Sequence, residues 1–232
     1  MPNTVLLNNI DHADLRVVQR RGAEYGDAVM SALTFPDEFR NLQAHYPIVF
    51  RKTADGTTFV PMALFGLREG ENLFLDARGW DASYVPLTIE RQPFLIGNAS
   101  GEWVVHIDLD SPRIAPAGEP VFRPHGGTTE FLERISSVLL TIHEGLQRTP
   151  AFIAALLEHE LLESFVFDVE LRDGTQSRLA GFYTINEESL GRLEGAALER
   201  LHRAGHLQAI YMALASLSNL RDLVERMNRR DA

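Results

Sequence analysis

The amino-acid sequence predicts an α+β fold, with a β-rich N-terminal half of short antiparallel strands and a helix-dominated C-terminal half that contains one β-hairpin. In the first half, short apolar runs are separated by glycine, proline, asparagine and aspartate, which is typical of strands joined by turns. After residue 128, apolar residues recur every three or four positions, as they do on the buried face of a helix. The segment Arg172-Asp173-Gly174-Thr175 lies between two alternating runs and predicts the hairpin.

In the N-terminal half, strands are expected at 4–7, 48–50, 59–67, 72–76, 94–96 and 102–109. Short helices are expected from Pro36 and over 84–92, and a turn is expected at 98–101. Pro61 lies within an apolar run and has no backbone N–H to donate, which favours an edge strand or a bulge. Prolines and glycines dominate residues 111–127, so we expect a linker or an active loop there.

In the C-terminal half, Thr128-Thr129-Glu130 is a helix-start signal, and apolar spacing predicts a helix through Leu146. Thr149-Pro150 is expected to start a second helix, because proline is favoured at a first helical position. The strands of the hairpin are expected at 165–171 and 177–185. Three further helices are expected at 186–193, 196–203 and 206–227, with Gly205 as a stop.

Composition excludes several classes of chemistry. The 232 residues carry 22 basic and 32 acidic side chains, a formal net charge of −10, which repels phosphate backbones and argues against nucleic-acid binding. There is no cysteine, so disulfides, thiol nucleophiles and zinc knuckles are excluded. Lys52 is the single lysine, and its context fits neither a phosphate-binding loop nor Schiff-base chemistry.

The length allows one large domain, and we expect a single domain over 1–232, with a possible subdivision into a β-rich part (1–110) and a helical part with the hairpin (128–232). No Sec-type signal peptide is visible at the N-terminus, and no apolar run reaches the roughly 18 residues that a membrane helix needs. A cytoplasmic protein without membrane insertion is therefore expected.

His106-Ile107-Asp108 is the sharpest chemical pattern. On a strand, His106 and Asp108 point to the same side and could share a metal ion. With a distant histidine they would form the facial triad of non-haem iron enzymes, which makes His106, Asp108 and His125 the candidate catalytic residues and iron or another divalent metal the candidate cofactor. The alternative is a strand end whose polar residues face water. Other histidines considered as the third ligand are His143, His159, His202 and His206.

Two further groups are candidate binding residues. Trp80, Tyr84 and Arg91 could line a ligand groove through stacking and cation–π contacts, or they could pack a loop onto the core. On the last helix, small residues and a tyrosine could form a homodimer or partner surface, or they could serve packing within the chain. The residues of this helix are Tyr211, Ala213, Ser216 and Asn219.

Several separated blocks resemble the bacterial SapC family, in the same order along the chain. They are EFRNLQAHYPIVF (38–50), FVPMALFGLREGENLFLD (59–76), WDASYVP (80–86), RQPF (91–94), FDVELRDGTQSRLAGFYTINEESL (167–190) and LQAIYMALASLSNLRDL (207–223). SapC-like proteins take their name from genes tied to a paracrystalline surface layer and its export, and the family has no agreed catalytic mechanism.

The resemblance, together with the lack of any complete catalytic constellation in the sequence, favours an accessory or adaptor protein in an envelope-linked or surface-layer-linked pathway, acting by protein–protein contact. Neither a cofactor nor an enzymatic activity is expected on this interpretation. The alternative, motivated by His106 and Asp108, is a small-molecule-binding protein or a metal-dependent enzyme of the non-haem iron kind.

Overall fold

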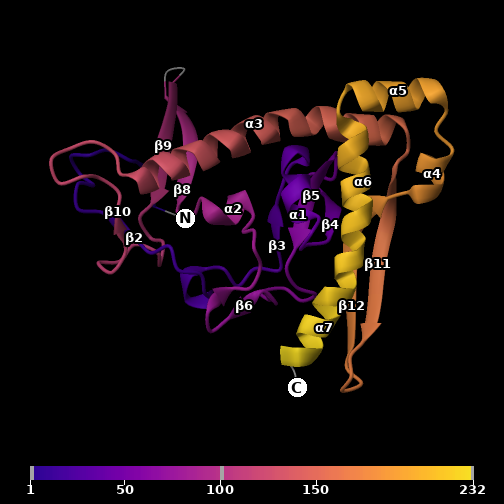
Figure 1. The fold of residues 1–232 in the computed structure, drawn as a ribbon, viewed down its shortest axis with the longest axis horizontal. Coiled ribbons are helices and arrows are strands. Elements are labelled where there is room, and N and C mark those ends of the chain that lie inside the picture. Colours follow the sequence, from indigo (N-terminus) through magenta and orange to yellow (C-terminus); the bar gives the residue numbers. More distant parts are fainter. Residues whose placement is uncertain (1–2, 100–101, 231–232) are drawn as a thin grey trace. The chain divides into compact units, whose positions relative to one another are not determined.

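The computed structural model of the chain describes residues 3–99 and 102–230, and its ribbon is drawn in Figure 1. The chain folds as two compact units, each assembled from three separated segments. Unit 1 comprises Met1–Ala28, Leu75–Asp81 and Leu87–Glu144, and unit 2 comprises Val29–Phe74, Ala82–Pro86 and Gly145–Ala232. Helices and antiparallel sheets are both present, and the C-terminal region is rich in helix, which confirms the α+β prediction. None of the described helices is long and apolar enough to cross a membrane.

Unit 1 is built on a three-stranded antiparallel sheet, with β9 (Glu102–Asp108) between β1 (Thr4–Leu6) and β8 (Phe94–Ala99). Its smaller elements are β2 (Arg16–Val17), η1 (Ala23–Tyr25), β6 (Leu75–Asp76), β7 (Gly79–Trp80), α2 (Leu87–Glu90) and β10 (Glu119–Pro120). β2 pairs with β10, and β6 pairs with β7. The predicted turn at 98–101 includes residues 100 and 101, which lie outside the described residues.

The core of unit 1 lies between this sheet and the first half of α3 (Glu130–Glu158). Phe94 and Ile107 are fully buried against Phe131 and Ile135 of the helix, and the rings of Phe94 and Phe131 meet edge to face at 5.8 Å. Because side chains alternate along a strand, the opposite face of the sheet carries Leu6, Leu95, His106 and Asp108.

Unit 2 contains a five-stranded antiparallel sheet, whose strand order is β11, β12, β4, β5, β3. These strands are β3 (Ser31–Leu33), β4 (Ile48–Lys52), β5 (Phe59–Leu64), β11 (Leu162–Glu170) and β12 (Gln176–Ile185). The helices are η2 (Pro36–Glu38), α1 (Phe39–Leu42), α4 (Glu187–Gly191), α5 (Gly195–Arg203), α6 (His206–Ser216), η3 (Leu217–Asn219) and α7 (Leu220–Arg230). Helix α6 lies alongside β12 and β4 (Figure 1), and a cluster of buried rings that includes Phe39, Phe50 and Phe152 fills the core.

The local signals in unit 2 are confirmed. The predicted hairpin β11–β12 forms, and β4 and β5, at the strands expected over 48–50 and 59–67, also pair with each other. The side chain of Asn186 caps α4 by accepting a 2.8 Å hydrogen bond from the N–H of Ser189. Gly205 separates α5 from α6 with a φ of 76°, a left-handed conformation that glycine adopts without steric cost.

Two predicted helix boundaries are wrong. The break expected at Thr149-Pro150 is absent. Helix α3 is a single helix of 29 residues that includes Pro150 in its interior. Proline removes one backbone donor, yet buried apolar residues on both sides of it keep the helix in place. Conversely, the helix predicted over 206–227 is interrupted by the 3-10 turn Leu217–Asn219, directly after Ser216, whose hydroxyl accepts from the N–H of Ile48.

The edge-strand prediction for Pro61 is also wrong, since β5 lies between β4 and β3. The carbonyl of Pro61 accepts a 3.0 Å hydrogen bond from the N–H of Thr34, so its backbone groups face the β3 side. β3 ends at Leu33, one residue earlier. In an antiparallel pair, an N–H at residue 61 would return this bond to the carbonyl of Thr34, so proline costs the sheet one hydrogen bond, at the point where β3 ends.

Candidate functional site

Unit 1 contains a cavity of about 340 Å³ where the chain leaves α2 and where β9 ends. The N–H of Asp108 donates to the carbonyl of Pro93 at 3.2 Å, which ties the end of β9 to the segment that follows α2. The polar residues that line the cavity are Thr4, Tyr25, Arg91, Gln92, Asp108, Asp110 and Ser111. Arg91 and Asp108, predicted separately as binding and metal-ligating residues, therefore share one cavity.

Arg91 provides the positive charge of this cavity. Its Nη1 donates a 2.6 Å hydrogen bond to the carbonyl of Phe94, which anchors the guanidinium to the start of β8. Burial lowers the pKa of Arg91. Among residues 3–99 and 102–230, no carboxylate forms an ion pair with it. A half-buried cation without a counter-charge is costly, so this position favours an anionic group from outside the chain.

A buried ion pair holds the Tyr25 side of the cavity. Asp27 is 0% exposed and Arg113 is 1% exposed, and their Oδ1 and Nη2 atoms lie 2.5 Å apart. Nη1 of Arg113 also donates to the carbonyls of Val18 and Arg20, at 3.2 and 3.0 Å. The guanidinium lies over the ring of Tyr25, 5.8 Å from its centroid. This network fixes η1 and orients Tyr25.

The structure does not assemble the predicted metal site from the residues it describes. The ring of His106 lies over Gly97 of the neighbouring strand, where an added Cβ would be 2.5 Å from Cε1 of the histidine. Oδ1 of Asp108 accepts from the N–H of Asp110 at 3.2 Å, while His125 is exposed in the turn at 123–127. No group of three His, Asp or Glu side chains in the described ranges is placed to hold a metal ion. His106 and Asp108 thus lack a third ligand there.

The three residues of the predicted groove are in different places. Arg91 lines the cavity, whereas Trp80 lies on β7 of unit 1 and is not part of the cavity lining. Tyr84 belongs to unit 2, where its hydroxyl donates to Oε1 of Glu38 at 3.0 Å and its carbonyl accepts from the hydroxyl of Tyr46. Tyr84 therefore has a structural role within the core of unit 2.

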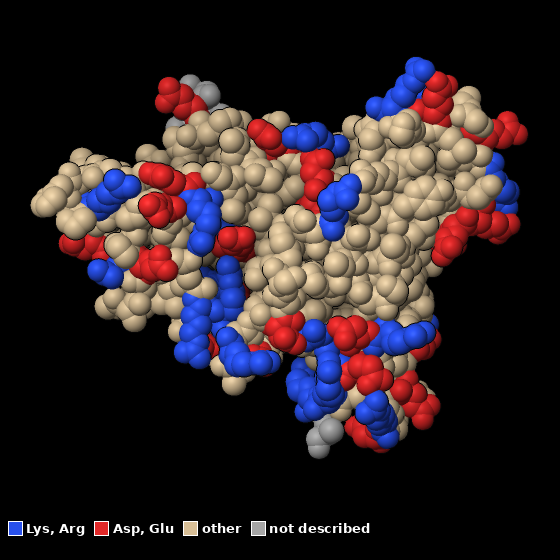
Figure 2. All heavy atoms as spheres, in the orientation of Figure 1, with Lys and Arg blue, Asp and Glu red and all other residues tan. Residues whose placement is uncertain are grey.

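Three of the four residues predicted as a partner surface on the last helix are used within unit 2. Ala213 and Ser216 are 1% and 0% exposed, and the side-chain amide of Asn219 donates to the carbonyl of Gln43 at 2.8 Å. Their small size allows α6 to approach β4 and α1 closely. Tyr211 is 55% exposed, and uncharged side chains cover the region of α6 in Figure 2, while charged ones gather around α5 and α7. The partner itself stays a prediction.

The hairpin β11–β12 has an open edge. β11 is nine residues long and is the outermost strand of its sheet. The carbonyl of Leu161 accepts from Asn186 and the N–H of Leu171 donates to Thr175, so odd-numbered residues of β11 face β12. Since backbone groups alternate in direction along a strand, those of the even-numbered residues 162–170 face outward. Within the described residues, no hydrogen bond is formed by this outer edge.

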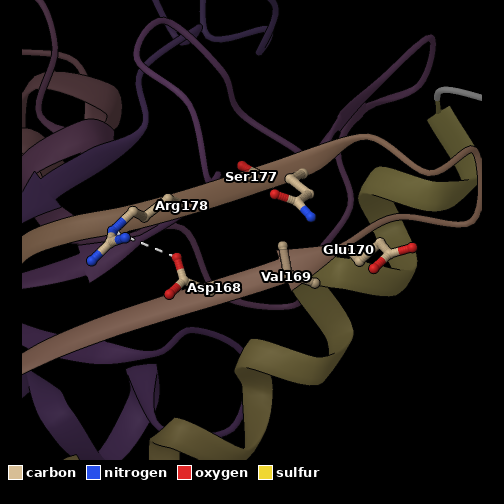
Figure 3. Close-up of a pocket in the computed structure, with 6 residues that line it drawn as sticks. Asp168, Val169, Glu170, Ser177 and Arg178 are labelled. Carbon is tan, nitrogen blue, oxygen red and sulfur yellow. Dashed lines mark ion pairs between the residues drawn. The ribbon is translucent and has the colours of Figure 1, made fainter.

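The end of this hairpin carries a shallow pocket of about 470 Å³, lined by both strands. Asp168 and Arg178 point toward one another across the two strands, with Oδ1 and Nε 3.5 Å apart, and Glu170 lies farther along β11 (Figure 3). Both partners are more than 60% exposed, so water screens this pair strongly. The edge is thus polar and acidic at its C-terminal end.

A family model described as SapC matches residues 7–223 of the chain. The chain belongs to the SapC family. The two units, the cavity of unit 1 and the open edge of β11 lie almost entirely within the matched range of this SapC chain. A search of the curated proteins finds no match, and no solved structure matches either.

Several residues of these sites were not predicted from the sequence. Tyr25, Asp110 and Ser111 line the cavity, but none belongs to a motif. The signal that was present is the run Asp108-Leu109-Asp110-Ser111, where polar residues gather directly after a strand. The open edge of β11 had no signal of its own, because the alternating pattern of a strand is the same at the edge and in the middle of a sheet.

Proposed function

We propose that this SapC-family chain is an accessory or adaptor protein of a cell-envelope or surface-layer-linked pathway, and that it acts by protein–protein contact. The observation that carries the proposal is the outer edge of β11, to which an extended segment of a partner adds as a further strand. Membership of the SapC family supports the pathway. The mode of contact rests on the geometry of the hairpin.

An open strand edge presents regularly spaced backbone donors and acceptors, and recognition by strand addition uses them directly. The outward-facing positions of β11 include Ser164, Val166 and Asp168, and the side chain of Val166 is 46% exposed. Glu170, which forms no ion pair among the described residues, gives the edge a negative end, whereas the charge of Asp168 is offset by Arg178. A partner segment with basic residues complements it, whereas a second copy of this chain, at a net charge of −10, is repelled.

The test is the substitution Val166→Pro, compared with Val166→Thr. Proline removes an outward-facing N–H and obstructs strand addition without removing a bond to β12. Threonine keeps the backbone donor and the branched shape. The full-length variants are expressed in the native host, cross-linked and purified, and the captured proteins are quantified.

We expect at least one envelope-associated protein to be captured by the wild type and by Val166→Thr, and to be reduced at least tenfold with Val166→Pro. Equal capture by all three forms would overturn the strand-addition mode. A sedimentation mass of twice the monomer that is lost in Val166→Pro would contradict the partner and identify a second copy instead.

A further inference from the structure

We infer that the cavity of unit 1 binds a small zwitterion of the amino-acid type, whose carboxylate faces Arg91 and whose ammonium group faces Asp108 and Asp110. This inference is independent of the proposed function, since it concerns residues of unit 1 and the proposed partner contact concerns β11 of unit 2. It rests on two properties of the cavity: the charges of both signs that line it, and its size.

The carboxylate end follows from the hydrogen bonds of Arg91. A guanidinium has five N–H donors in a planar fork, and the described residues use one nitrogen of Arg91, the Nη1 that donates to Phe94. That bond holds the side chain in a fixed orientation, which suits the binding of a carboxylate by two parallel hydrogen bonds. Arg91 lies in the wall of the cavity, so its remaining donors are within reach of a ligand there.

The ammonium end follows from Asp108 and Asp110. Both side chains line the cavity, and the hydrogen bond given to Oδ1 of Asp108 by the N–H of Asp110 leaves Oδ2 unused in the described structure. Neither carboxylate forms an ion pair within residues 3–99 and 102–230. Arg91 and these two acids therefore line one cavity without neutralising each other, as a ligand with separated charges requires.

The dimensions and the remaining wall define the size of the ligand. A volume of about 340 Å³ is at the small end of ligand cavities, which span roughly 300–1,000 Å³. Tyr25, Pro93 and Leu95 give the wall an aromatic and aliphatic part suited to a short methylene chain. The hydroxyls of Thr4 and Ser111 add polar contacts. The buried pair of Asp27 and Arg113 holds Tyr25 in place, so the wall is formed before a ligand arrives.

The experiment is titration calorimetry of the full-length protein with a ladder of ω-amino acids, from glycine through β-alanine and 4-aminobutyrate to 6-aminohexanoate. The ladder varies the distance between the two charges in steps of one methylene. Butylamine and pentanoate, which carry one charge each, are the matched controls. We expect one or two adjacent members of the ladder to bind at least tenfold more tightly than either control.

Arg91→Gln and the double variant Asp108→Asn/Asp110→Asn each test one end of the ligand, and Arg178→Gln in unit 2 is the control. We expect each cavity variant to weaken the best ladder member at least tenfold and to leave the singly charged control for the opposite end unchanged. The variant Asp108→Asn/Asp110→Asn should stay folded, because Asp110 is exposed and asparagine at position 108 keeps the Oδ1 acceptor. It therefore tests the inference even if Arg91→Gln unfolds the unit.

Two outcomes overturn the inference. One is the absence of heat for every member of the ladder at millimolar concentration. The other is equal binding of pentanoate and the best ω-amino acid, which would show a simple anion site that uses Arg91 alone. Binding that persists in both cavity variants would place the ligand elsewhere and also contradict the assignment.

Discussion

The buried pair of Asp27 and Arg113 allows a quantitative prediction for the stability of unit 1. Asp27→Asn preserves the shape of the side chain but removes its charge, and it leaves a guanidinium that is 1% exposed without its 2.5 Å counter-ion. Breaking a buried ion pair on one side costs about 3–5 kcal/mol, because an uncompensated charge remains in a medium that solvates it poorly. We therefore expect the free energy of unfolding of unit 1 to fall by about this amount.

Urea denaturation followed by tryptophan fluorescence measures this change selectively. Both tryptophans of the chain, Trp80 and Trp103, lie in unit 1, so their emission reports on this unit. For a chain of this size, the expected loss corresponds to a decrease in Tm of roughly 6–20 °C.

The matched control replaces both members of this pair, as Asp27→Leu/Arg113→Met. Substitution of a buried pair by apolar residues is often neutral or stabilising, but Arg21, whose Nη1 lies 3.6 Å from Oδ1 of Asp27, loses its carboxylate in both variants. The double variant should therefore recover the part of the stability that Asp27→Asn loses through Arg113. The reasoning is refuted if Asp27→Asn costs less than about 1 kcal/mol, the level of an exposed pair, or if the double variant is as unstable as the single one.

Three further predictions concern unit 2. Replacement of glycine by alanine usually stabilises a helix interior. At Gly145 the new Cβ would collide with the buried ring of Phe35, so Gly145→Ala should lower the free energy of unfolding by about 1–2 kcal/mol. Urea denaturation followed by circular dichroism measures this change, and a gain in stability would contradict this packing. Pro150→Ala restores the donor for the carbonyl of Leu146, so the free energy of unfolding should rise by up to about 3 kcal/mol, with a higher Tm. An unchanged Tm would show that the missing donor costs this helix nothing. Burial lowers the pKa of His206, whose Nδ1 is buried without a hydrogen-bond partner in the described structure. The neutral imidazole therefore contributes its full stability above about pH 6.5, the ordinary pKa of histidine, and this stability is lost as the pH falls through the lowered pKa of the folded state. Thermal scans by circular dichroism should show this loss in the wild type and a smaller one in His206→Phe.

The parts of the fold that depend on neighbouring residues could be predicted from the sequence. The turn at Asp173-Gly174 is an example, since Oδ1 of Asp173 accepts from the N–H of Thr175 and Gly174 has a φ of 83°. The interruption of the last helix after Ser216 could not be predicted. It coincides with a hydrogen bond between Ser216 and Ile48, two residues that only the folded chain brings together.

The candidate site shows the same division. Arg91 and Asp108 were each notable in the sequence, Arg91 among aromatic and proline residues and Asp108 two positions after a histidine. Their meeting in one cavity depends on the register of β8 and β9, in which Phe94 pairs with Ile107, and on the bond from Asp108 to Pro93. The small residues of α6 indicated that another element packs closely against this helix. The sequence could not distinguish an element of the same chain from one of a partner.

The division of the chain into interleaved segments has a consequence for synthesis on the ribosome. The last segment of unit 1 ends at Glu144, so all of its residues are available before residues 145–232 emerge. Strands β3, β4 and β5 of unit 2 are made early, but β12 and α6, which cover them, come from the end of the chain. Val49 and Phe50, both 0% exposed in the finished fold, are therefore exposed to solvent until the end of the chain is translated. Transiently exposed apolar residues promote aggregation, so a chaperone is most useful to the nascent chain during this interval.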